Sequence, residues 1–555
     1  MPGGDSPDGF ATAAHARALG GHAGLPRTGQ DYPGRHFVLI HDFLVNSAGR
    51  DPDQVAVIHG ATRASYGSVD DLSHRLAGAL VRAGIAFGDR VVLLAENSVD
   101  YVVGYYGVLR AGAIAVPLFP STTDRELEYV LRHCDARGVI VGAQAAESLD
   151  RVCRRLNELR LLIALAGARV QPASWQILQT WDQALDPKPT FAAAERRFDT
   201  DPAMIVYTSG TTGEPKGVTL SHLNVVANTT SIVEYLRLKR EDRVMAVLPF
   251  PYVYGKSLLN THFYVGGTVV IDNRFVFPNA VLGTMQREKV TGFAGVPSTF
   301  ATLLNKSKFA ELQWPDLRYV TQAGGAMAPA LTTRLLDAIP RVEIYVMYGA
   351  TEASARLSYL HPKDLPRKIG SIGKAIPNVE LKVIGENSVE LRPGETGEIV
   401  ARGPNMMLGY WNDPEATESV RWRDGIRTGD LGYRDHEGFF YIVGRNKEMI
   451  KTSGYRVGPK EVEEVLLEVP AIVEAAVVGV PHDELGECVV AFVVPREPNS
   501  VSAEQLIQHC RRRLAGYKVP SEIRLLDAIP KNQAGKLDKR ALRKSMGESG
   551  FSVST

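Results

Sequence analysis

The chain has 555 residues, of which 45% are hydrophobic, and its 63 Lys and Arg residues balance 62 Asp and Glu residues. A formal net charge of +1 provides no broad basic field for nucleic acid or an anionic membrane, and the apolar fraction excludes a wholly disordered chain. At roughly 150 residues per domain, the length suggests three or four domains.

The four cysteines are scattered at positions 134, 153, 488 and 510, without a CxxC pair. This pattern argues against a disulfide scaffold or a zinc ribbon, and reduced thiols fit a cytoplasmic protein. No stretch reaches the roughly 18 consecutive apolar residues of a membrane span. Residues 1–36 are rich in Gly, Ala, Pro and His and lack the apolar core of a secretory signal, so we expect a disordered leader there.

From about residue 37, helix-like runs alternate with short, nearly continuous apolar stretches. Such stretches are typical of strands that are buried on both faces. The pattern therefore predicts an α/β fold of mostly parallel sheets with helices on both faces. The apolar stretches lie at 90–94, 113–116, 138–141, 244–247, 269–271 and 344–347.

The pattern changes after about residue 375. Short strands separated by Gly, Pro and Asp turns predict a small β-barrel-like subdomain, and beyond residue 444 a compact α+β pattern follows. We therefore predict an N-terminal domain over 37–446, a smaller C-terminal domain over 447–546 and a tail over 547–555. In the C-terminal domain the predicted elements are a helix at 459–468, strands at 475–480 and 489–494, and a helix at 503–514.

The most informative segment is YTSGTTGEPKG at 207–217, which follows an apolar strand and precedes a helix-like run that Ser221 can cap. Its glycines let backbone N–H groups approach an anion, its hydroxyls donate hydrogen bonds, and its lysine adds a positive charge. The alternative is a Ser/Thr/Gly linker. The segment lacks the spacing of a Walker A loop. The candidate phosphate-binding residues are Thr208, Ser209, Gly210, Thr211, Thr212 and Lys216.

This segment resembles the phosphate loop of the adenylate-forming superfamily, which comprises acyl-CoA synthetases, peptide-synthetase adenylation domains and luciferases. Further motifs follow in the family's order and cover roughly residues 38–545. The resemblance implies a large N-terminal adenylation domain and a C-terminal domain that moves. These motifs are QAGGA at 322–326, YGATE at 348–352, GEIVARG at 397–403, LGYW at 408–411, TGD at 428–430, GRNKEMIKTSG at 444–454 and PKNQAGKLD at 530–538.

Two of these motifs are expected to hold magnesium and adenine. A Glu beside a Thr at the end of a strand can hold Mg²⁺ next to phosphates, and a solvated turn is the alternative. The resemblance implies that Glu352, with Thr208, coordinates the magnesium of ATP, that Thr351 contacts phosphate and that Tyr348 packs on adenine. The loop residues that it places along the adenine and acyl pockets are Gly324, Gly325 and Ala326.

The C-terminal motifs are expected to hold the ribose and the reacting groups. A carboxylate can accept both ribose hydroxyls, and the resemblance assigns this role to Asp430, with Arg445 as a second contact. It also implies that Lys447 is the hinge residue and that Lys536 bridges the acid's carboxylate and the α-phosphate. Lys451 then faces the site in a second step, after the C-terminal domain rotates. The alternatives are a turn residue for Asp430 and solvated surface lysines.

The segment after the strand at 244–248 is expected to line the acyl pocket. It has no acidic residue near Pro251 to pair with an α-ammonium group, which argues against an amino acid as substrate. Many related ligases carry His where this chain has Tyr252. Together Tyr252, Tyr254 and Lys256 predict an aromatic, partly cationic pocket that suits an aryl or polar acid. The alternative is that Lys256 points to solvent.

The resemblance therefore implies an ATP- and Mg²⁺-dependent ligase that forms an acyl-adenylate and transfers the acyl group to a thiol. The acceptor is expected in trans, with CoA first and a separate carrier protein second. Transfer to an amine and activation of nitrite for diazotisation use the same nucleotide chemistry. A nucleotide-binding module without catalysis is disfavoured because Glu352, Asp430 and Lys536 are all present. No nucleic-acid partner is expected, and a homo-oligomer is compatible with the sequence.

Overall fold

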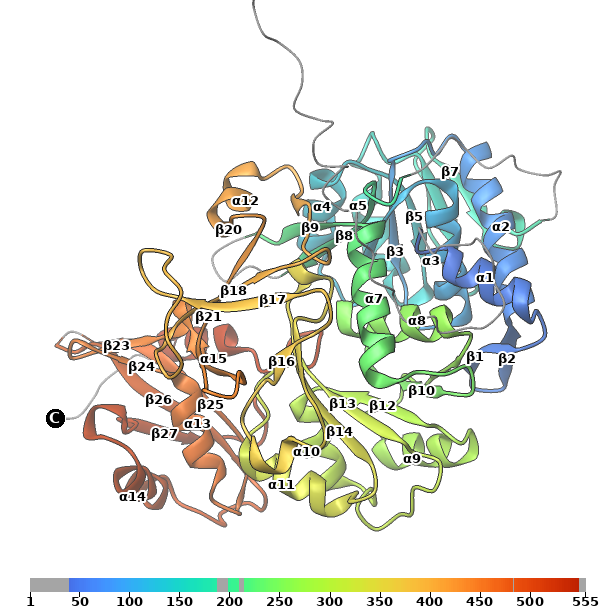
Figure 1. The fold of residues 1–555 in the computed structure, drawn as a ribbon. Helices are drawn as coiled ribbons and strands as arrows, with labels where there is room; N and C mark the ends of the chain where they lie inside the picture. Colours follow the sequence, from blue (N-terminus) through green and yellow to red (C-terminus); the bar gives the residue numbers. More distant parts are fainter. Residues whose placement is uncertain (1–38, 187–197, 209–213, 483, 549–555) are drawn as a thin grey trace, which may run out of the picture. The chain divides into compact units, whose positions relative to one another are not determined.

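The computed structural model describes residues 39–186, 198–208, 214–482 and 484–548. Two large, mostly parallel sheets, a small antiparallel sheet and a C-terminal mixed sheet carry the fold, with helices between the strands (Figure 1). This arrangement confirms the predicted α/β fold class. The leader predicted at 1–36 and most of the tail lie outside the described residues, as do the motif positions 209–213.

The first large sheet has the strand order β19-β9-β8-β4-β3-β5-β6-β7. Its strands from β8 to β7 are parallel, and β9 runs antiparallel to both β8 and β19. The bounds are β3 Arg90–Leu94, β4 Ile114–Leu118, β5 Ala136–Val141, β6 Leu161–Ala164, β7 Ile177–Thr180, β8 Pro202–Thr208, β9 Lys216–Ser221 and β19 Gly409–Tyr410.

The second large sheet has the order β16-β15-β14-β13-β12-β10-β11-β1-β2, and the run from β14 to β1 is parallel. The bounds are β1 Val55–His59, β2 Thr62–Ser65, β10 Arg243–Ala246, β11 Thr268–Ile271, β12 Gly292–Gly295, β13 Tyr319–Gln322, β14 Glu343–Tyr348, β15 Ser358–Leu360 and β16 Lys374–Ala375.

Two smaller sheets follow. In the first, β22 pairs with β21 beside the order β17-β18-β21-β20, and in the second, β27 pairs with β26 beside β24-β23-β26-β25. The bounds are β17 Glu380–Ile384, β18 Gly397–Arg402, β20 Arg421–Trp422, β21 Gly425–Arg434, β22 Phe440–Arg445, β23 Ile450–Thr452, β24 Tyr455–Val457, β25 Ile472–His482, β26 Gly486–Pro495 and β27 Glu522–Leu525.

The helices connect these strands, and α7 and α8 lie side by side (Figure 1). Their bounds are α1 Asp42–Arg50, α2 Tyr66–Arg82, α3 Val99–Ala111, α4 Asp124–His133, α5 Ala143–Cys153, α6 Trp181–Ala184, α7 His222–Leu236, α8 Val253–Val265, α9 Pro278–Arg287, α10 Pro297–Lys306, α11 Pro329–Ala338, α12 Pro414–Val420, α13 Pro459–Leu467, α14 Ala503–Arg513 and α15 Lys539–Glu548.

Buried apolar residues fill the space between the sheets and these helices. All five residues of β4 are buried, as expected for a strand covered on both faces. Val116 of β4 packs in one cluster with Leu127 of α4 and Leu149 of α5. In the second large sheet, Val320 of strand β13 packs in one cluster with Leu335 of helix α11. Both large sheets are therefore packed against helices, and they support the loops at the ends of their strands.

The surroundings of the segment at 207–217 differ from the prediction in one respect. A strand, β9, begins at Lys216 within this segment and continues to helix α7, so the loop joins two antiparallel strands and does not lead directly into a helix. Val218 and Leu220 of β9 are buried, which explains why this short stretch joins the sheet. Ser221 caps α7 as predicted: its Oγ accepts from Asn224 N–H at 3.1 Å, and Asn224 Oδ1 accepts from Ser221 N–H at 2.8 Å.

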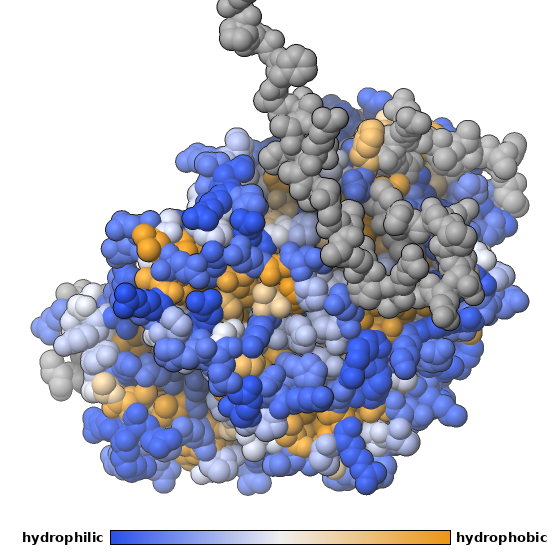
Figure 2. All heavy atoms as spheres, viewed as in Figure 1, coloured by the Kyte–Doolittle hydropathy of each residue, from blue (hydrophilic) through white to orange (hydrophobic). Residues whose placement is uncertain are grey.

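On the face drawn in Figure 2, hydrophilic residues cover most of the surface, and apolar residues show through in separate patches. Within the described residues, no helix combines the length and the hydropathy that crossing a bilayer requires.

Gly255 in α8 allows a close approach that another residue would prevent. A Cβ at this position would lie 2.1 Å from the carbonyl oxygen of Pro249, whereas a Cβ at Gly283 in α9 would meet no atom within 4 Å. We expect Gly255→Ala to lower the free energy of unfolding by about 1–3 kcal/mol through overpacking. Gly283→Ala should raise it by up to about 1 kcal/mol, because Ala favours a helix. Denaturant unfolding of both variants checks this, and equal stability would contradict it.

Candidate active site

The hairpin formed by β8 and β9 carries the predicted phosphate loop. Thr208 ends β8 and faces Lys216, the first residue of β9, and the Thr208 hydroxyl lies 3.5 Å from the Lys216 carbonyl oxygen. The hairpin therefore holds both residues at the base of the loop. The predicted phosphate-binding residues Ser209, Gly210, Thr211 and Thr212 lie outside the described residues.

Tyr410 links this hairpin to the predicted magnesium ligand. The Lys216 ammonium lies 5.0 Å from the centroid of the Tyr410 ring, and the Tyr410 hydroxyl donates to Glu352 Oε1 at 2.8 Å. Burial, followed by the charge of Glu352, raises the pKa of Tyr410, so this hydroxyl stays a donor. The structure thus gathers Lys216 and Glu352 around one tyrosine. Sequence reasoning missed Tyr410, and the only signal for it is its place in the segment LGYW.

The donor groups at this point suit a magnesium ion that is held together with phosphates. Within the described residues, no group of three or more His, Cys, Asp or Glu side chains forms a metal cluster. Mg²⁺ in nucleotide sites needs none, since it takes one or two carboxylates together with phosphate oxygens and water. The carboxylate of Glu352 fits this requirement, and Thr351 lies in the same short helix, Thr351–Ala353.

Asp430 is a buried carboxylate with two donors. The Tyr348 hydroxyl, at the end of β14, donates to Asp430 Oδ2 at 2.5 Å, and Arg445 Nε lies 3.0 Å from Oδ1. Asp430 and Arg445 face each other across the β21–β22 pair. Asp430 is only 4% exposed and lies within a strand, so the alternative of a solvated turn residue is wrong. Burial raises the pKa of Asp430, and the nearby Arg445 guanidinium partly opposes this.

Tyr252, Gly324 and Lys536 lie together. The Lys536 ammonium is 5.2 Å from the centroid of the Tyr252 ring. A Cβ at Gly324, whose φ is +87°, would lie 2.7 Å from the Tyr252 hydroxyl and 3.3 Å from Lys536 Cε, so only glycine leaves this space free. Ser298 Oγ donates to the carbonyl of Gly535 at 2.9 Å, which holds the loop carrying Lys536 against this site.

Lys536 differs from its basic neighbours in the same segment. Lys531 pairs with Glu474 at 2.6 Å, and Lys539 pairs with Glu463 at 2.7 Å. Among the described residues, no carboxylate pairs with Lys536, whose ammonium is directed at a tyrosine ring. This arrangement does not match the alternative of a uniformly solvated basic tail.

Two residues predicted for the acyl pocket are buried. Tyr254 is 1% exposed and donates to the carbonyl of Thr321 at 2.8 Å. Lys256 is 3% exposed; its ammonium lies 2.9 Å from the Tyr101 hydroxyl and 3.9 Å from the centroid of the Tyr105 ring. The alternative that Lys256 points to solvent is therefore wrong. Burial also holds its pKa well below the ordinary value, which opposes the positive charge expected of Lys256.

Other predicted residues lie apart from these groups. Lys451 is exposed on β23, where its backbone N–H donates to Glu487 Oε2 at 2.7 Å, and Lys447 is exposed in the short helix Asn446–Glu448. In the loop after β13, Gly325 and Ala326 are exposed. No described contact brings Lys451 or Lys447 to the groups around Lys536.

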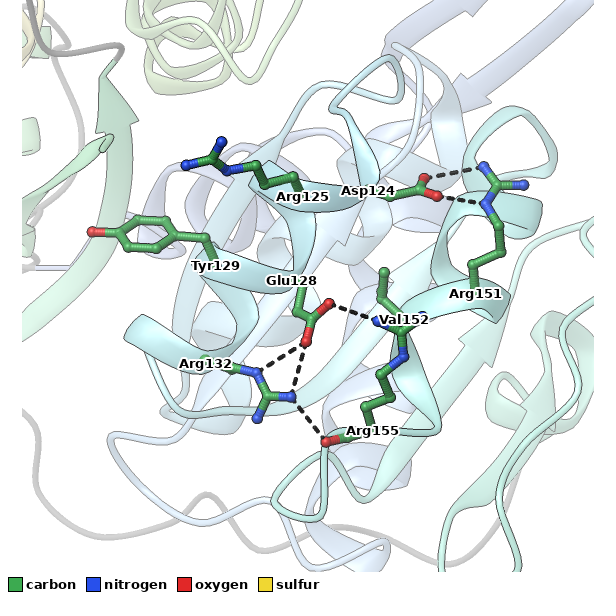
Figure 3. A pocket seen from close by; sticks show the side chains of 8 residues that line it. All are labelled: Asp124, Arg125, Glu128, Tyr129, Arg132, Arg151, Val152 and Arg155. Atoms are coloured by element: carbon green, nitrogen blue, oxygen red, sulfur yellow. Dashed lines mark hydrogen bonds and ion pairs between the residues drawn. The ribbon is translucent and has the colours of Figure 1, made fainter. Parts of the chain in front are cut away.

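A groove of about 540 Å³ lies between α4 and α5, and Figure 3 shows the side chains that line it. None of the predicted site residues lines this groove. Its arginines are paired with carboxylates: Arg132 and Arg155 with Glu128, and Arg151 with Asp124. The fourth arginine, Arg125, pairs with Glu214, so each arginine of the groove has a carboxylate partner, and we place the groove outside the candidate site.

Comparison with known proteins gives two family matches. The model described as "AMP-binding enzyme" matches residues 44–411, and that of the "AMP-binding enzyme C-terminal domain" matches residues 461–536.

Similar proteins over most of the chain act on different acids. An indoleacetate–CoA ligase of Aromatoleum aromaticum is 31% identical over 93% of this chain and 100% of its own length. A long-chain-fatty-acid–CoA ligase of Bacillus subtilis is 34% identical over 91% of this chain and 94% of its own length. The crystal structure of an anthranilate CoA ligase in complex with anthranoyl-AMP matches with a TM-score of 0.85 at 27% identity, over 93% and 99% of the two chains.

The raised pKa of Asp430 gives a prediction that separates stability from binding. A carboxyl group whose pKa is higher in the folded than in the unfolded protein opposes folding once it must ionise. We expect Asp430→Asn to keep or raise the midpoint of thermal unfolding at pH 7. This gain should vanish below about pH 3.9, the pKa of Asp in an unfolded chain, because the carboxyl group is then protonated in both the folded and the unfolded protein.

The same substitution should raise the KM for ATP by on the order of tenfold, because a charged acceptor is lost. Thermal unfolding across pH and steady-state kinetics measure the two effects. An unchanged KM for ATP, or a lower unfolding midpoint at pH 7, would contradict the interpretation.

Proposed function

Because the chain belongs to the AMP-binding enzyme family, we propose that it is an AMP-forming ligase that activates a carboxylic acid and transfers the acyl group to the thiol of CoA. In the first step the acid's carboxylate attacks the α-phosphate of ATP, which gives an acyl-adenylate and pyrophosphate. In the second step the thiol attacks the acyl carbon and AMP leaves.

This order of steps follows from leaving-group chemistry. A carboxylate cannot react directly with a thiol, since oxide would have to leave, whereas AMP is a good leaving group. The first step needs no general base, because its nucleophile is already an anion. It does need positive charge near the phosphates and an in-line carboxylate, and such positioning is the main contribution of phosphoryl-transfer enzymes.

The contact between Lys536 and Tyr252 carries this proposal. Lys536 has no carboxylate partner among the described residues and lies beside Gly324, where no side chain fills the space. An ammonium group placed there can bind the acid's carboxylate and an α-phosphate oxygen together, which brings the two reacting anions into contact. Its role is to hold these two groups, and no proton moves at Lys536 in this step.

The nucleotide is proposed to lie between two groups of residues, one around Asp430 and the other around Glu352. Asp430 accepts hydrogen bonds from the ribose, with Arg445 beside it and the Tyr348 ring against adenine. At the phosphate end, Lys216 supplies positive charge, and Glu352 with Thr208 holds the magnesium ion that neutralises the phosphates when it is bound. Thr351 and the remaining loop residues donate hydrogen bonds to phosphate oxygens.

The second step is proposed to follow a rotation of the C-terminal domain. We place its boundary between Asn446 and Lys447, with Lys447 as the hinge, and the two family matches lie on either side of this position. Rotation removes Lys536 from the site and brings the face around Lys451 and Gly454 to it. Gly454 is exposed and has no side chain to obstruct a thin pantetheine arm.

The acid is proposed to be aryl or polar. Tyr252 and Tyr254 supply two rings whose centroids lie 6.2 Å apart, and aromatic faces of this kind pack well on a flat acyl group. Similar enzymes act on indoleacetate and anthranilate, although others act on long-chain fatty acids. We also place the enzyme in the cytoplasm, where ATP and CoA are available; its four buried cysteines are all free.

Substitution of Lys536 tests the first step. Lys536→Ala should lower the rate of ATP–pyrophosphate exchange by at least about 10²-fold, as expected when a charged group that stabilises a transition state is lost. ATP binding, measured by calorimetry, should change little. Lys531→Ala is the matched control, since Lys531 lies in the same segment and pairs with Glu474. Exchange at the wild-type rate in Lys536→Ala would contradict the mechanism.

The acceptor is tested by product analysis. With ATP and an accepted acid, CoA should convert the bound acyl-adenylate to an acyl-CoA thioester that mass spectrometry detects, and AMP release should become faster. AMP release that ignores CoA and responds instead to an amine, nitrite or a carrier protein would contradict CoA as the acceptor, while the adenylation step would stand.

A further inference from the structure

Arg356 is a buried cation that the proposed mechanism does not use. It lies four residues after Glu352 and is 2% exposed. Its Nε lies 3.3 Å from the Met347 sulfur, a weak acceptor, and its Nη1 lies 3.3 Å from the Ala355 carbonyl oxygen. Among the residues that the structure describes, no carboxylate pairs with its guanidinium; its polar neighbours, the Met347 sulfur, the Ala355 carbonyl and the Tyr235 hydroxyl, are all uncharged.

An unpaired charge inside a protein is strongly unfavourable. Lys256 avoids this penalty because burial lowers its pKa and the amine can lose its proton. An arginine stays protonated in proteins, so it cannot avoid the penalty by losing a proton. The charge of a buried arginine is usually balanced by a carboxylate, as it is at Arg318. This residue stacks on Tyr319 and also pairs with Asp242 at 2.8 Å. Arg356 has no such carboxylate partner among the described residues, so a bound anion can supply its counter-charge.

The position of Arg356 indicates where this counter-charge enters. Its guanidinium carbon lies 4.0 Å from the centroid of the Tyr254 ring. Tyr254 neighbours Tyr252, and Lys536 contacts the Tyr252 ring. A row of contacts thus runs from Lys536 through the two tyrosines of the proposed acyl pocket to Arg356. The row has a cation at each end and aromatic rings between them.

The backbone of Arg356 is held in place. Asn228 Nδ2 of α7 and Asn405 Nδ2 each donate to the Arg356 carbonyl oxygen at 2.9 Å. Two buried amides therefore fix the backbone of Arg356 from different elements, and the guanidinium is held by its contacts with the Tyr254 ring and the Met347 sulfur before any ligand arrives. A preorganised cation of this kind favours binding, because little conformational freedom is lost when the anion binds.

We propose that the acid substrate is a dicarboxylic acid whose second carboxylate pairs with Arg356. This inference rests on the proposed function: one carboxylate is adenylated beside Lys536, while the other accepts hydrogen bonds from the guanidinium behind Tyr254. A carboxylate suits the planar fork of arginine, which can donate to both of its oxygens. The two carboxylates are held apart by a body that packs on the tyrosine rings, such as an aromatic ring.

Matched pairs of acids test the proposal by ATP–pyrophosphate exchange. Each pair combines a diacid with the monoacid of the same body, for example benzene-1,4-dicarboxylate with benzoate, and adipate with hexanoate. For at least one pair, the wild-type enzyme should show a kcat/KM for the diacid that is tenfold higher or more, the ratio expected for one charged hydrogen-bonded contact.

Arg356→Gln should abolish this preference and leave the KM for ATP unchanged, and Arg356→Lys should restore part of it. Arg318→Lys is the matched control, because Arg318 also stacks on a tyrosine but already has a carboxylate partner, so the ratio should stay at the wild-type value.

The outcomes separate this inference from the proposed function. Exchange with monoacids but no preference for any diacid would overturn the role of Arg356 and leave the ligase assignment standing. A preference that persists in Arg356→Gln would overturn it too. If Arg356→Gln does not fold, Arg356→Lys decides, since its KM must rise for the diacid and not for the monoacid. An absence of exchange with every acid would instead contradict the proposed function.

Discussion

The hydrogen bonds around Asp430 join the parts of the chain on which the site depends. Tyr348 is the last residue of a parallel strand, whereas Asp430 and Arg445 lie opposite each other in the small antiparallel sheet. The Tyr348–Asp430 bond therefore fixes the end of β14 against that sheet. Glu352 follows β14 within four residues, and its carbonyl accepts from Met407 N–H at 2.8 Å. The position of the proposed magnesium ligand is thus set from both sides.

Burial affects the basic groups of the site in different ways. Lys256 is enclosed by tyrosines and is favoured as a neutral amine. An arginine keeps its charge when it is buried, and Arg356 is therefore the residue to which we assign an anionic group of the substrate. Lys216 and Lys536 contact tyrosine rings and can pair with the anions of the reaction. The chain, which is nearly neutral overall, thereby places Lys216 and Lys536 where the proposed phosphates and carboxylate lie.

The parts of the fold that local patterns determine were predictable from the sequence. Apolar stretches and helical spacing indicated the parallel sheets, and the Ser221 cap gave the start of α7. Strand β9 was missed because it directly follows a Gly-rich loop and ends at Ser221, immediately before helix α7. Tyr410, Tyr101 and Arg356 were missed because their meaning comes from distant partners: Tyr410 contacts Glu352, 58 residues away, and Tyr101 contacts Lys256, 155 residues away. No local pattern indicates such contacts.

An isotope measurement tests the central claim, attack of the acid on the α-phosphate, most directly. The acid is labelled with ¹⁸O in both carboxylate oxygens and turned over with ATP and CoA. Attack at the α-phosphate leaves one labelled oxygen bridging carbon and phosphorus, and the thiol then breaks the carbon–oxygen bond. The account predicts AMP that carries one ¹⁸O atom and pyrophosphate that carries none. Unlabelled AMP formed together with the thioester would contradict it.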